Sequence, residues 1–553
     1  MKDIIDIILY GIQIILPLIA LLIVYNCFKS VKRSARGNTP LIALVNKVTK
    51  EKIPVLYWEN SIGRSKSCDI TIDSTTVSRD HAVLFRREKG WFISDTNSKT
   101  GVLVNKRRIS ESKQVYINDV IEIGGIEFWL KEAKVISGYK DWFSFKDKIF
   151  KNVLSPGLLL FYVSLFHVLV GIELCFSKGQ FEYEPLMVAG LIVVISWMYF
   201  IINKYLFRRI SFELESLGIL LSGIGIMTIC GSNLNDTYNQ LIAMTIGLAV
   251  FDIIILFISN PDVVMKWRIV IACGAIGLFV ANIALGTIKN GSQNWIILGP
   301  VSIQPSEFVK VAFVLVGTST LERLQTTKNL TEFIIFSGLC MVSLFIMGDF
   351  GTACIFFVTF LIVAFMRSGS VRTVILICSA AALGAMMIIK FKPYITDRFS
   401  VWRHVWEHMN DMGYQQTRVM TYSASGGLFG LGVGRGYLKN VFASTSDLIF
   451  GMLCEEWGLI LALIVVFSIA MLSVYSKKVS INSRSTFYSI AACSSAGLLL
   501  FQMCLNVFGA TDILPLTGVT LPFLSAGGSS MVSTWGLLAF IKAADERTYA
   551  ARR

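Results

Sequence analysis

Apolar stretches long enough to cross a membrane recur along this 553-residue chain, and they limit its fold more than any other feature. A helix of roughly 20 residues crosses a hydrocarbon core of roughly 30 Å, and lipid leaves the backbone no hydrogen-bond partner except itself. The sequence therefore predicts a polytopic α-helical membrane protein with thirteen spans. They are expected at residues 4–25, 153–175, 186–205, 212–231, 239–259, 266–287, 306–321, 333–348, 350–367, 371–389, 447–474, 486–508 and 520–543.

The net charge of +14 is distributed in a way that orients these spans. Basic residues gather in alternate connections, such as Arg208-Arg209 and Lys477-Lys478, which is the positive-inside pattern of membrane proteins. This pattern argues against a nucleic-acid-binding surface. The basic connections are expected in the cytoplasm, and the loops 288–305 and 390–446 are expected on the outer face.

The eleven cysteines and four histidines show no metal-binding arrangement. The cysteines lie scattered, mostly within apolar stretches, and no C-x-x-C pair occurs. We therefore expect them to be small buried side chains.

The same patterns divide the chain into segments. Acidic residues flank the start of the first apolar stretch and basic residues follow it, so residues 1–37 are expected to be a membrane anchor with its N-terminus outside. Short alternating runs such as Trp91–Asp95 predict an inserted cytoplasmic all-β sandwich over residues 38–135. The other segments are a basic linker (136–152), two additional spans (153–209), a large membrane domain (210–545) and a basic cytoplasmic tail (546–553).

The predicted sandwich carries the motifs of a recognition domain. Gly63-Arg64, Val77-Ser78-Arg79-Asp80-His81 and Ser98-Lys-Thr100-Gly101 resemble a forkhead-associated (FHA) domain, over residues 45–131. The resemblance implies phosphothreonine binding by Arg64, Ser78, Arg79 and Thr100, since a phosphate takes a guanidinium and a hydroxyl donor. His81 would brace the loop. Thr100 stands where the family usually has Asn, and a scaffold that recruits partners without reading phosphate is the alternative.

The outer loop 390–446 is far longer than a connection requires, which favours a functional role. Its basic residues are not explained by topology and indicate an anionic ligand. They are Lys390, Lys392, Arg398, Arg403, Arg418, Arg435 and Lys439. The glycine-rich run 426–436 offers backbone N–H groups to oxyanions. Asp447 follows at the start of an apolar stretch, where it is either a functional carboxylate or a helix cap.

Glu307 and Lys310 lie three residues apart in the stretch 306–321, so their side chains share one face of the expected helix. Ionisable groups at membrane depth normally pair or line a cavity. The sequence leaves two roles open for Lys310: a structural ion pair, and a direct contact with a substrate phosphate.

Three blocks of the membrane domain carry a second resemblance. They are residues 294–310, residues 413–456 with the glycine-rich run and Asp447, and residues 506–530 with Gly527-Gly528-Ser529-Ser530. Together they resemble the SEDS family (shape, elongation, division and sporulation), whose RodA and FtsW members polymerise peptidoglycan. The resemblance spans residues 210–545 and implies a ten-span fold for that part.

The SEDS resemblance implies glycosyl transfer on the outer face. Lipid II would be polymerised into glycan strands by inverting transfer with release of undecaprenyl diphosphate, and Asp447 would be the catalytic base. Matching positions imply substrate binding by Trp295, Glu307, Lys310, Gln416, Arg435, Lys439, Ser529 and Ser530. No tightly bound cofactor is expected, although a divalent cation (Mg or Mn) held weakly near Asp447 would stabilise the leaving group's charge.

Several positions depart from the SEDS pattern. The histidine that usually precedes the catalytic aspartate is replaced, and Asn294 stands where a basic residue usually precedes the loop tryptophan. Asp349 is kept without its preceding Glu and Pro, and Ala526 replaces a tyrosine. These departures affect the subclass and the rate more than the type of reaction.

The resemblance also implies partners and a location. The chain would act in the plasma membrane of a bacterium with a class B penicillin-binding transpeptidase, and its FHA domain would bind a phosphothreonine protein. The two additional spans are candidate docking elements for a partner. Two other functions stay open: a flippase for lipid-linked precursors, which needs no base, and a catalytically inactive signalling scaffold. Elongation, division and sporulation are not distinguished.

Overall fold

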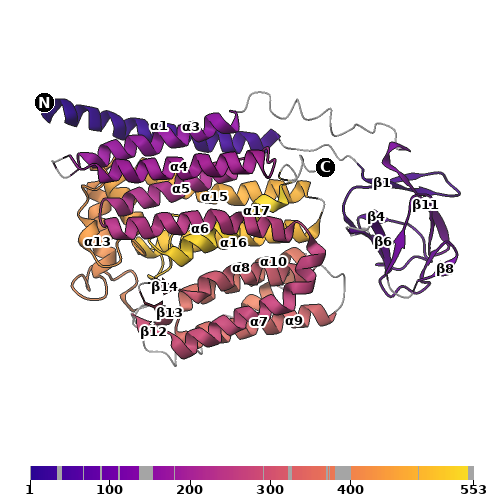
Figure 1. Cartoon of the computed structure of the whole chain (residues 1–553). Coiled ribbons are helices and arrows are strands. Elements are labelled where there is room, and N and C mark those ends of the chain that lie inside the picture. The colour runs from indigo at the N-terminus through magenta and orange to yellow at the C-terminus, as the bar shows by residue number, and fades with distance from the viewer. Residues whose placement is uncertain are drawn as a thin grey trace.

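The chain folds into an all-β sandwich and a bundle of helices (Figure 1). The computed structural model describes residues 2–33, 40–65, 68–87, 90–109, 112–135, 154–177, 179, 181–289, 292–299, 301–321, 327–368, 371–372, 374–379, 400–483, 485–545 and 548. The predicted fold class, a polytopic helical protein with an inserted sandwich, is confirmed. The predicted basic linker 136–152 lies outside the described residues, as does the tail 546–553 apart from Thr548.

Two sheets form the sandwich, with strand orders β2-β1-β11-β10-β7-β8 and β4-β3-β5-β6-β9. Side chains alternate between the core and the surface along strands such as β6 and β10, as the pleat of a strand requires. The strands are β1 (Ile42–Asn46), β2 (Lys52–Val55), β3 (Glu59–Gly63), β4 (Ile70–Thr71), β5 (Ala82–Arg87), β6 (Gly90–Asp95), β7 (Val102–Val104), β8 (Arg107–Arg108), β9 (Ser112–Val115), β10 (Val120–Ile123) and β11 (Ile126–Glu132), and the short helix η1 (Ala133–Val135) follows.

The bundle consists mainly of long apolar helices. They are α1 (Lys2–Arg33), α3 (Pro156–Cys175), α4 (Glu184–Tyr205), α5 (Glu213–Cys230), α6 (Leu234–Ile258), α7 (Pro261–Leu285), α8 (Pro305–Leu321), α9 (Thr327–Met347), α10 (Phe350–Ser368), α15 (Gly458–Asn482), α16 (Thr486–Ala510) and α17 (Gly528–Ala544). Shorter elements are α13 (Tyr414–Ser425), η3 (Leu438–Asn440), α14 (Ile449–Met452), η4 (Leu453–Trp457) and the strands β12 (Thr287–Lys289), β13 (Ser292–Leu298) and β14 (Val301–Ile303).

Two of the expected spans, 447–474 and 520–543, differ from these helices, and the span 371–389 is only partly described. Among the described residues, nine helical segments are long and apolar enough to cross a membrane. Helices α8 and α17 have 17 residues each, and α9 contributes the shorter apolar segment Thr331–Met347. The expected span 520–543 begins as a loop, because α17 starts only at Gly528. The expected span 371–389 lies largely outside the described residues, so the total of thirteen stays a prediction.

The expected span 447–474 is divided in the structure. It begins with the single turn α14, continues through the π-helical turn η4, and becomes α15 at Gly458, whose φ of +83° suits a glycine. A π turn inserts an extra residue into a helix and is frequent at functional sites. Here it presents Glu455 and Glu456, both buried, to the glycine-rich loop.

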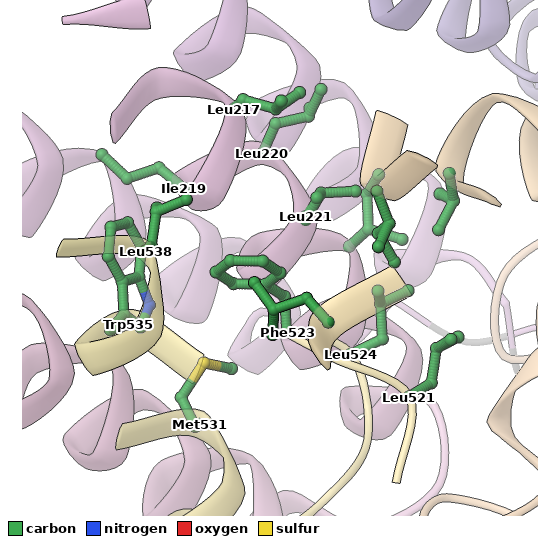
Figure 2. Close-up of a cluster of buried hydrophobic side chains, with 14 of the residues drawn as sticks. Leu217, Ile219, Leu220, Leu221, Leu521, Phe523, Leu524, Met531, Trp535 and Leu538 are labelled. Carbon is green, nitrogen blue, oxygen red and sulfur yellow. The ribbon is translucent and has the colours of Figure 1, made fainter. Parts of the chain in front are cut away.

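Helix α17 lies in the middle of the bundle because small residues let it approach its neighbours. A Cβ atom at Gly218 of α5 or Gly247 of α6 would come within 2.7 or 2.8 Å of the Trp535 ring. Figure 2 shows Trp535 beside Phe523 among leucines of α5, and the two rings meet edge to face at 5.8 Å. Close approach at glycine is how membrane helices gain packing that lipid alone does not drive.

Two buried ion pairs fasten this core close to the sandwich. Lys542 of α17 lies 2.9 Å from Glu215 of α5, with both side chains at most 1% exposed. Arg209, in the α4–α5 connection, lies 2.6 Å from Asp252 of α6. Each charge is paired, as burial at membrane depth requires.

The sandwich and the small sheet β12–β13–β14 lie at opposite ends of the bundle (Figure 1). We call the end with the sandwich the sandwich end. The end with β12–β14 is called the cavity end, after the cavity described below. The first residues of α7 and α16 are at the sandwich end, where they contact Arg87 and Glu59 of the sandwich. Helix α13 is at the cavity end. The β strands of the 288–305 loop were not foreseen from the sequence.

Candidate functional site

A cavity of about 760 Å³ lies among the segments of the cavity end. Its walls come from β13, the start of α10, the segment before α14, and the loop between α16 and α17. The residues that line it are Ser292, Asn294, Trp295, Gln304, Gly348, Asp349, Phe350, Gly351, Cys354, Gln415, Phe442, Ala443, Ser446, Asp447, Leu505, Leu514, Pro515, Leu516, Thr517, Gly518, Thr520, Ala526, Gly527 and Ser530. The cavity therefore gathers parts of all three sequence blocks.

Asp447 is half-buried in the wall of this cavity, and its backbone is held on both sides. Its N–H donates to Ala443 O at 3.0 Å, and its carbonyl accepts from Asn506 Nδ2 at 2.8 Å. The carboxylate faces Gly518, where an added Cβ would lie 3.5 Å from Oδ2. Leu448, not Asp447, is the N-cap of α14, so the capping alternative is not what the structure shows.

A second carboxylate, Asp349, lines the same cavity, although it was not among the predicted site residues. Its Oδ1 accepts from Thr352 N at 3.1 Å at the start of α10, and its Oδ2 accepts from Asn294 Nδ2 at 3.2 Å. Asn294, which departs from the SEDS pattern, is thus in contact with Asp349, which is kept. Because Asn294 is neutral, this contact leaves the charge of Asp349 uncompensated by that partner.

Of the other predicted substrate-binding residues, Trp295 and Ser530 line the cavity. The Ser530 hydroxyl lies 2.7 Å from Thr520 Oγ1, and the Ser529 hydroxyl accepts from Gln304 N at 3.1 Å behind the lining. Gln416 is buried away from the cavity, and its neighbour Gln415 takes the lining position.

Of the two roles that the sequence left open for Lys310, the structure shows the ion pair with Glu307. Their charged atoms lie 2.7 Å apart, the Lys310 side chain is 1% exposed, and neither residue lines the cavity. Lys310 Nζ also donates to Gln502 Oε1 at 2.9 Å, and Ser533 Oγ donates to Glu307. This network joins α8, α16 and α17 under the cavity.

The glycine-rich run and the two residues that follow it bind carboxylates of the same chain. Tyr437 N and Leu438 N donate to Glu455 at 2.7 and 2.9 Å, and Gly434 N donates to Glu456 at 2.9 Å. The expectation that these N–H groups serve a ligand is corrected on this point, because the oxyanions they meet are internal.

Arg435, within the run, and Lys439, three residues after it, were predicted to bind substrate. Neither lines the cavity. Lys439 Nζ donates to Gly434 O at 2.7 Å and closes the loop on itself. Arg435 is half-buried and near Glu173 of α3, whose Oε1 accepts from Val433 N at 3.2 Å and from Gln13 of α1 at 3.0 Å. The additional span α3 thus helps to hold the glycine-rich run.

Within the described part of the chain, no three His, Cys, Asp or Glu side chains gather in a way that could hold a metal ion. Asp349 and Asp447 share the cavity with hydroxyl groups of Ser446, Thr520 and Ser530. Such an all-oxygen set suits a magnesium ion that keeps several of its waters.

A second site lies at one end of the sandwich, where the loops after β3, β4 and β6 meet. Arg64, Arg79 and Thr100 are exposed there, and the Ser78 hydroxyl accepts from Lys99 N at 3.1 Å. We call these loops the recognition end. All four predicted phosphopeptide-binding residues, Arg64, Ser78, Arg79 and Thr100, lie in them.

His81 braces the recognition end from inside. Its ring is fully buried, with Nδ1 accepting from Ser78 N at 3.0 Å and Nε2 lying 3.1 Å from Gly101 O. Gly63 is required beside it, because an added Cβ would lie 2.1 Å from Arg79 O. Burial beside Asp80 raises the pKa of the Cys68 thiol to about 11, so it stays protonated under these loops.

Comparison with known proteins identifies both parts. Residues 217–550 match the family described as "Cell cycle protein", which takes its label from FtsW, RodA and SpoVE, and residues 60–124 match the FHA domain. Stage V sporulation protein E of Bacillus subtilis (strain 168) is 28% identical over 308 residues, which cover 53% of this chain and 82% of that protein.

Two further relatives extend the comparison. The probable peptidoglycan glycosyltransferase FtsW of Saccharophagus degradans is 29% identical over 359 residues, covering 61% of this chain and 92% of that protein. A chain from the solved structure described as "Structural coordination of polymerization and crosslinking by a peptidoglycan synthase complex" superposes with a TM-score of 0.52 at 21% identity. It covers 60% of this chain and 96% of its own length, which shows a shared fold.

Replacing Glu455 by alanine tests the internal anchoring of the glycine-rich run. The change leaves the N–H groups of Tyr437 and Leu438 without their acceptor, so the free energy of unfolding should fall by about 2–4 kcal/mol. Thermal unfolding of the detergent-solubilised protein measures this loss. Glu455→Gln keeps an acceptor oxygen and should lose less. An alanine variant as stable as the wild type would show that the loop does not depend on this carboxylate.

Proposed function

This chain belongs to the family of cell cycle proteins that includes FtsW, RodA and SpoVE, and from this we propose that it is a peptidoglycan glycosyltransferase acting in the cavity around Asp447. Relatives in the family carry the name peptidoglycan glycosyltransferase. The observation that carries the proposal is the placement of Asp447. A carboxylate matching the family's catalytic aspartate lies half-buried in a cavity of about 760 Å³, with its backbone fixed by Asn506.

In the proposed reaction Asp447 acts as the general base. It takes the proton of a sugar hydroxyl on one lipid-linked disaccharide-peptide while that oxygen bonds to the anomeric carbon of the growing strand. The bond from that carbon to the lipid diphosphate breaks, and the electron pair leaves with the phosphate oxygen. One displacement inverts the configuration, so a single base suffices. Lipid II is the proposed donor and acceptor unit, and undecaprenyl diphosphate is the proposed leaving group.

The negative charge of the leaving diphosphate must be stabilised by a positive charge. The residues of the cavity wall show which groups could supply it. Among the residues that line the described cavity none is a lysine, an arginine or a histidine. Asp349 and Asp447 instead suit a weakly held divalent cation, Mg or Mn, which would stabilise the diphosphate when bound. Lys390, Lys392 and Arg398 of the outer loop lie outside the described residues.

The protein is a multi-pass membrane protein, and we propose that it lies in the plasma membrane of a bacterium with the cavity on the outer face. The basic connections support a cytoplasmic sandwich and C-terminus and an N-terminus outside. The sandwich and the strands β12–β14 lie at opposite ends of the bundle (Figure 1), and β13 lines the cavity, which supports this orientation.

Two partners follow from the two sites. The solved peptidoglycan synthase complex couples polymerization to crosslinking, and by analogy we propose a class B penicillin-binding transpeptidase as the membrane partner. The FHA domain is proposed to bind a phosphothreonine protein through Arg64 and Ser78, with Arg79 and Thr100 beside the peptide. A phosphate bound there would gain charge-assisted bonds from the exposed guanidinium groups.

Asp447→Ala should reduce polymerisation of lipid II by the purified protein at least about 10²-fold, because the attacking hydroxyl loses its base. Product length on gels measures this. Asp447→Asn keeps the size of the residue and its backbone hydrogen bonds and should lose activity equally, while both variants unfold at the wild-type temperature. Full activity in either variant would refute the catalytic assignment and leave the flippase or the scaffold as the function.

Removal of divalent cations with a chelator should lower polymerisation by the wild type, and Mg should restore it. The reason is the lack of a cationic side chain in the described cavity wall. Asp349→Asn should raise the Mg concentration needed for half-maximal rate, whereas Asp69→Asn in the sandwich should not. Chelator-resistant activity would place the counter-charge on the basic residues of the outer loop instead.

Arg64→Ala should weaken binding of a phosphothreonine peptide to the full-length protein by roughly tenfold or more, because one charge-assisted bond is lost. Fluorescence titration with a phosphothreonine peptide library and its unphosphorylated counterpart measures this. Lys106→Ala, in the turn between β7 and β8 at the other end of the sandwich, is the matched control. Equal weak binding by wild type and Arg64→Ala would favour a scaffold that does not read phosphate.

A further inference from the structure

Among the described residues, the FHA domain touches the membrane bundle through a small surface, which we call the docking end. It comprises Trp58 and Glu59 at the start of β3 and Arg87 at the end of β5. Trp58 packs against the apolar core of the bundle, and its ring meets Tyr488 of α16 edge to face at 6.1 Å. The Tyr488 hydroxyl in turn donates to Ile258 O of α6 at 2.8 Å, which fixes the ring.

Glu59 closes the N-terminus of α16. Its carboxylate accepts from Thr486 N at 2.9 Å and from Ser485 Oγ at 3.1 Å, while Ser485 itself makes no side-chain cap. A helix N-terminus has unpaired N–H groups and partial positive charge, so a carboxylate there is stabilising. The sandwich therefore supplies a cap that α16 lacks in its own sequence.

Arg87 extends this contact to a second helix. Its guanidinium lies 3.4 Å from Glu59 and 3.2 Å from Asp262 in the first turn of α7. The side chains of Glu59 and Arg87 are 7% and 18% exposed, so the pair is largely shielded from water, whereas Asp262 is 32% exposed. The docking end thus combines an aromatic contact, a helix cap and a bridging cation on two membrane helices.

The docking end and the recognition end are at opposite ends of one strand. Strand β3 begins at Glu59 and ends at Gly63, and Arg64 follows directly. Five residues of extended chain separate the two functions by roughly 16 Å. Strand β5 runs antiparallel to β3 and joins the same two ends, because His81 precedes its first residue and Arg87 is its last. A ligand at Arg64 therefore need not displace the contact at Glu59.

The geometry points to the FHA domain as a reader held in cis on the membrane bundle. It docks on α7 and α16 through Trp58, Glu59 and Arg87, and it accepts a phosphothreonine segment at its free recognition end at the same time. A phosphorylated protein bound there is held beside the sandwich ends of α7 and α16. The docking part of this proposal is argued from contacts alone. The binding of a phosphothreonine segment rests on the proposed function of the recognition end.

Hydrogen exchange of the full-length protein in lipid nanodiscs tests the docking. Glu59→Ala should speed exchange at the first turn of α16 roughly fivefold, the usual effect of losing a helix cap. Glu127→Ala is the matched control, since Glu127 pairs with Lys47 inside the FHA domain at 2.6 Å. Exchange at wild-type rate in Glu59→Ala would overturn the docking.

A change on the bundle side separates docking from folding of the FHA domain. Asp262→Arg places like charges at the contact and should speed exchange at the first turn of α16 while the protection of β5 and β6 is kept. Glu332→Arg is its control, because Glu332 pairs with Arg268 of α7 and not with the sandwich. An effect of equal size in both variants would mean that general helix loosening, not docking, was measured.

Simultaneous binding is tested by adding a phosphothreonine peptide library to the same samples. Wild-type protein should keep its protection at the first turn of α16 when the peptide is bound, and peptide affinity should be the same in wild type and Asp262→Arg. Loss of that protection on binding would overturn the cis arrangement. Intact docking without any peptide binding would refute the phosphothreonine-reading function and the simultaneous binding with it, while the docking surface would stand.

Discussion

The cavity depends on two buried amides of α16. Asn506 donates to Asp447 O at 2.8 Å and to Val519 O at 2.7 Å, so one side chain joins the two segments that face each other across the site. Gln502, one turn earlier, accepts from Lys310 and donates to Thr520. In a medium without water these bonds have no substitutes, and breaking one leaves a buried polar group unpaired. The position of the proposed base is thus set by a helix that carries no catalytic residue of its own.

Most buried charges of the bundle are placed by pairing within the chain. Lys310 with Glu307, Lys542 with Glu215 and Arg209 with Asp252 are closed pairs within the bundle. Glu455 and Glu456 are satisfied by backbone N–H groups instead. Asp349 and Asp447 face a cavity whose described walls carry no cationic side chain. Carboxylate oxygens are ligands that a magnesium ion prefers, and this is the physical basis for the proposed divalent ion.

Local patterns in the sequence predicted most of the helices and the sandwich, because apolar length and alternation are local properties. Motif spacing, also local, singled out Asp447 as the candidate base. The loop before α17 was taken as helix, since its apolar residues Leu521, Phe523 and Leu524 pack on α5 from a non-helical backbone. Asp349 and Gln415 were missed as lining residues because their position depends on contacts between distant segments. The role of the glycine-rich run was misjudged for the same reason: its acceptors, Glu455 and Glu456, follow about 20 residues later in a π turn that periodicity does not reveal.

Helix α16 has the FHA domain at its first turn and the proposed base near its last, roughly 30 Å apart at 1.5 Å per residue. A cap acts on the N–H groups of the first turn, and its electrostatic effect falls off within that turn. Losing Glu59 should therefore loosen the first turn of α16 without disturbing the bonds of Gln502 and Asn506, which are fixed by α8 and by the loop before α17. Docking on this helix is suited to holding a phosphorylated partner at a set place on the bundle. The position of Asp447 is fixed by Gln502 and Asn506 instead.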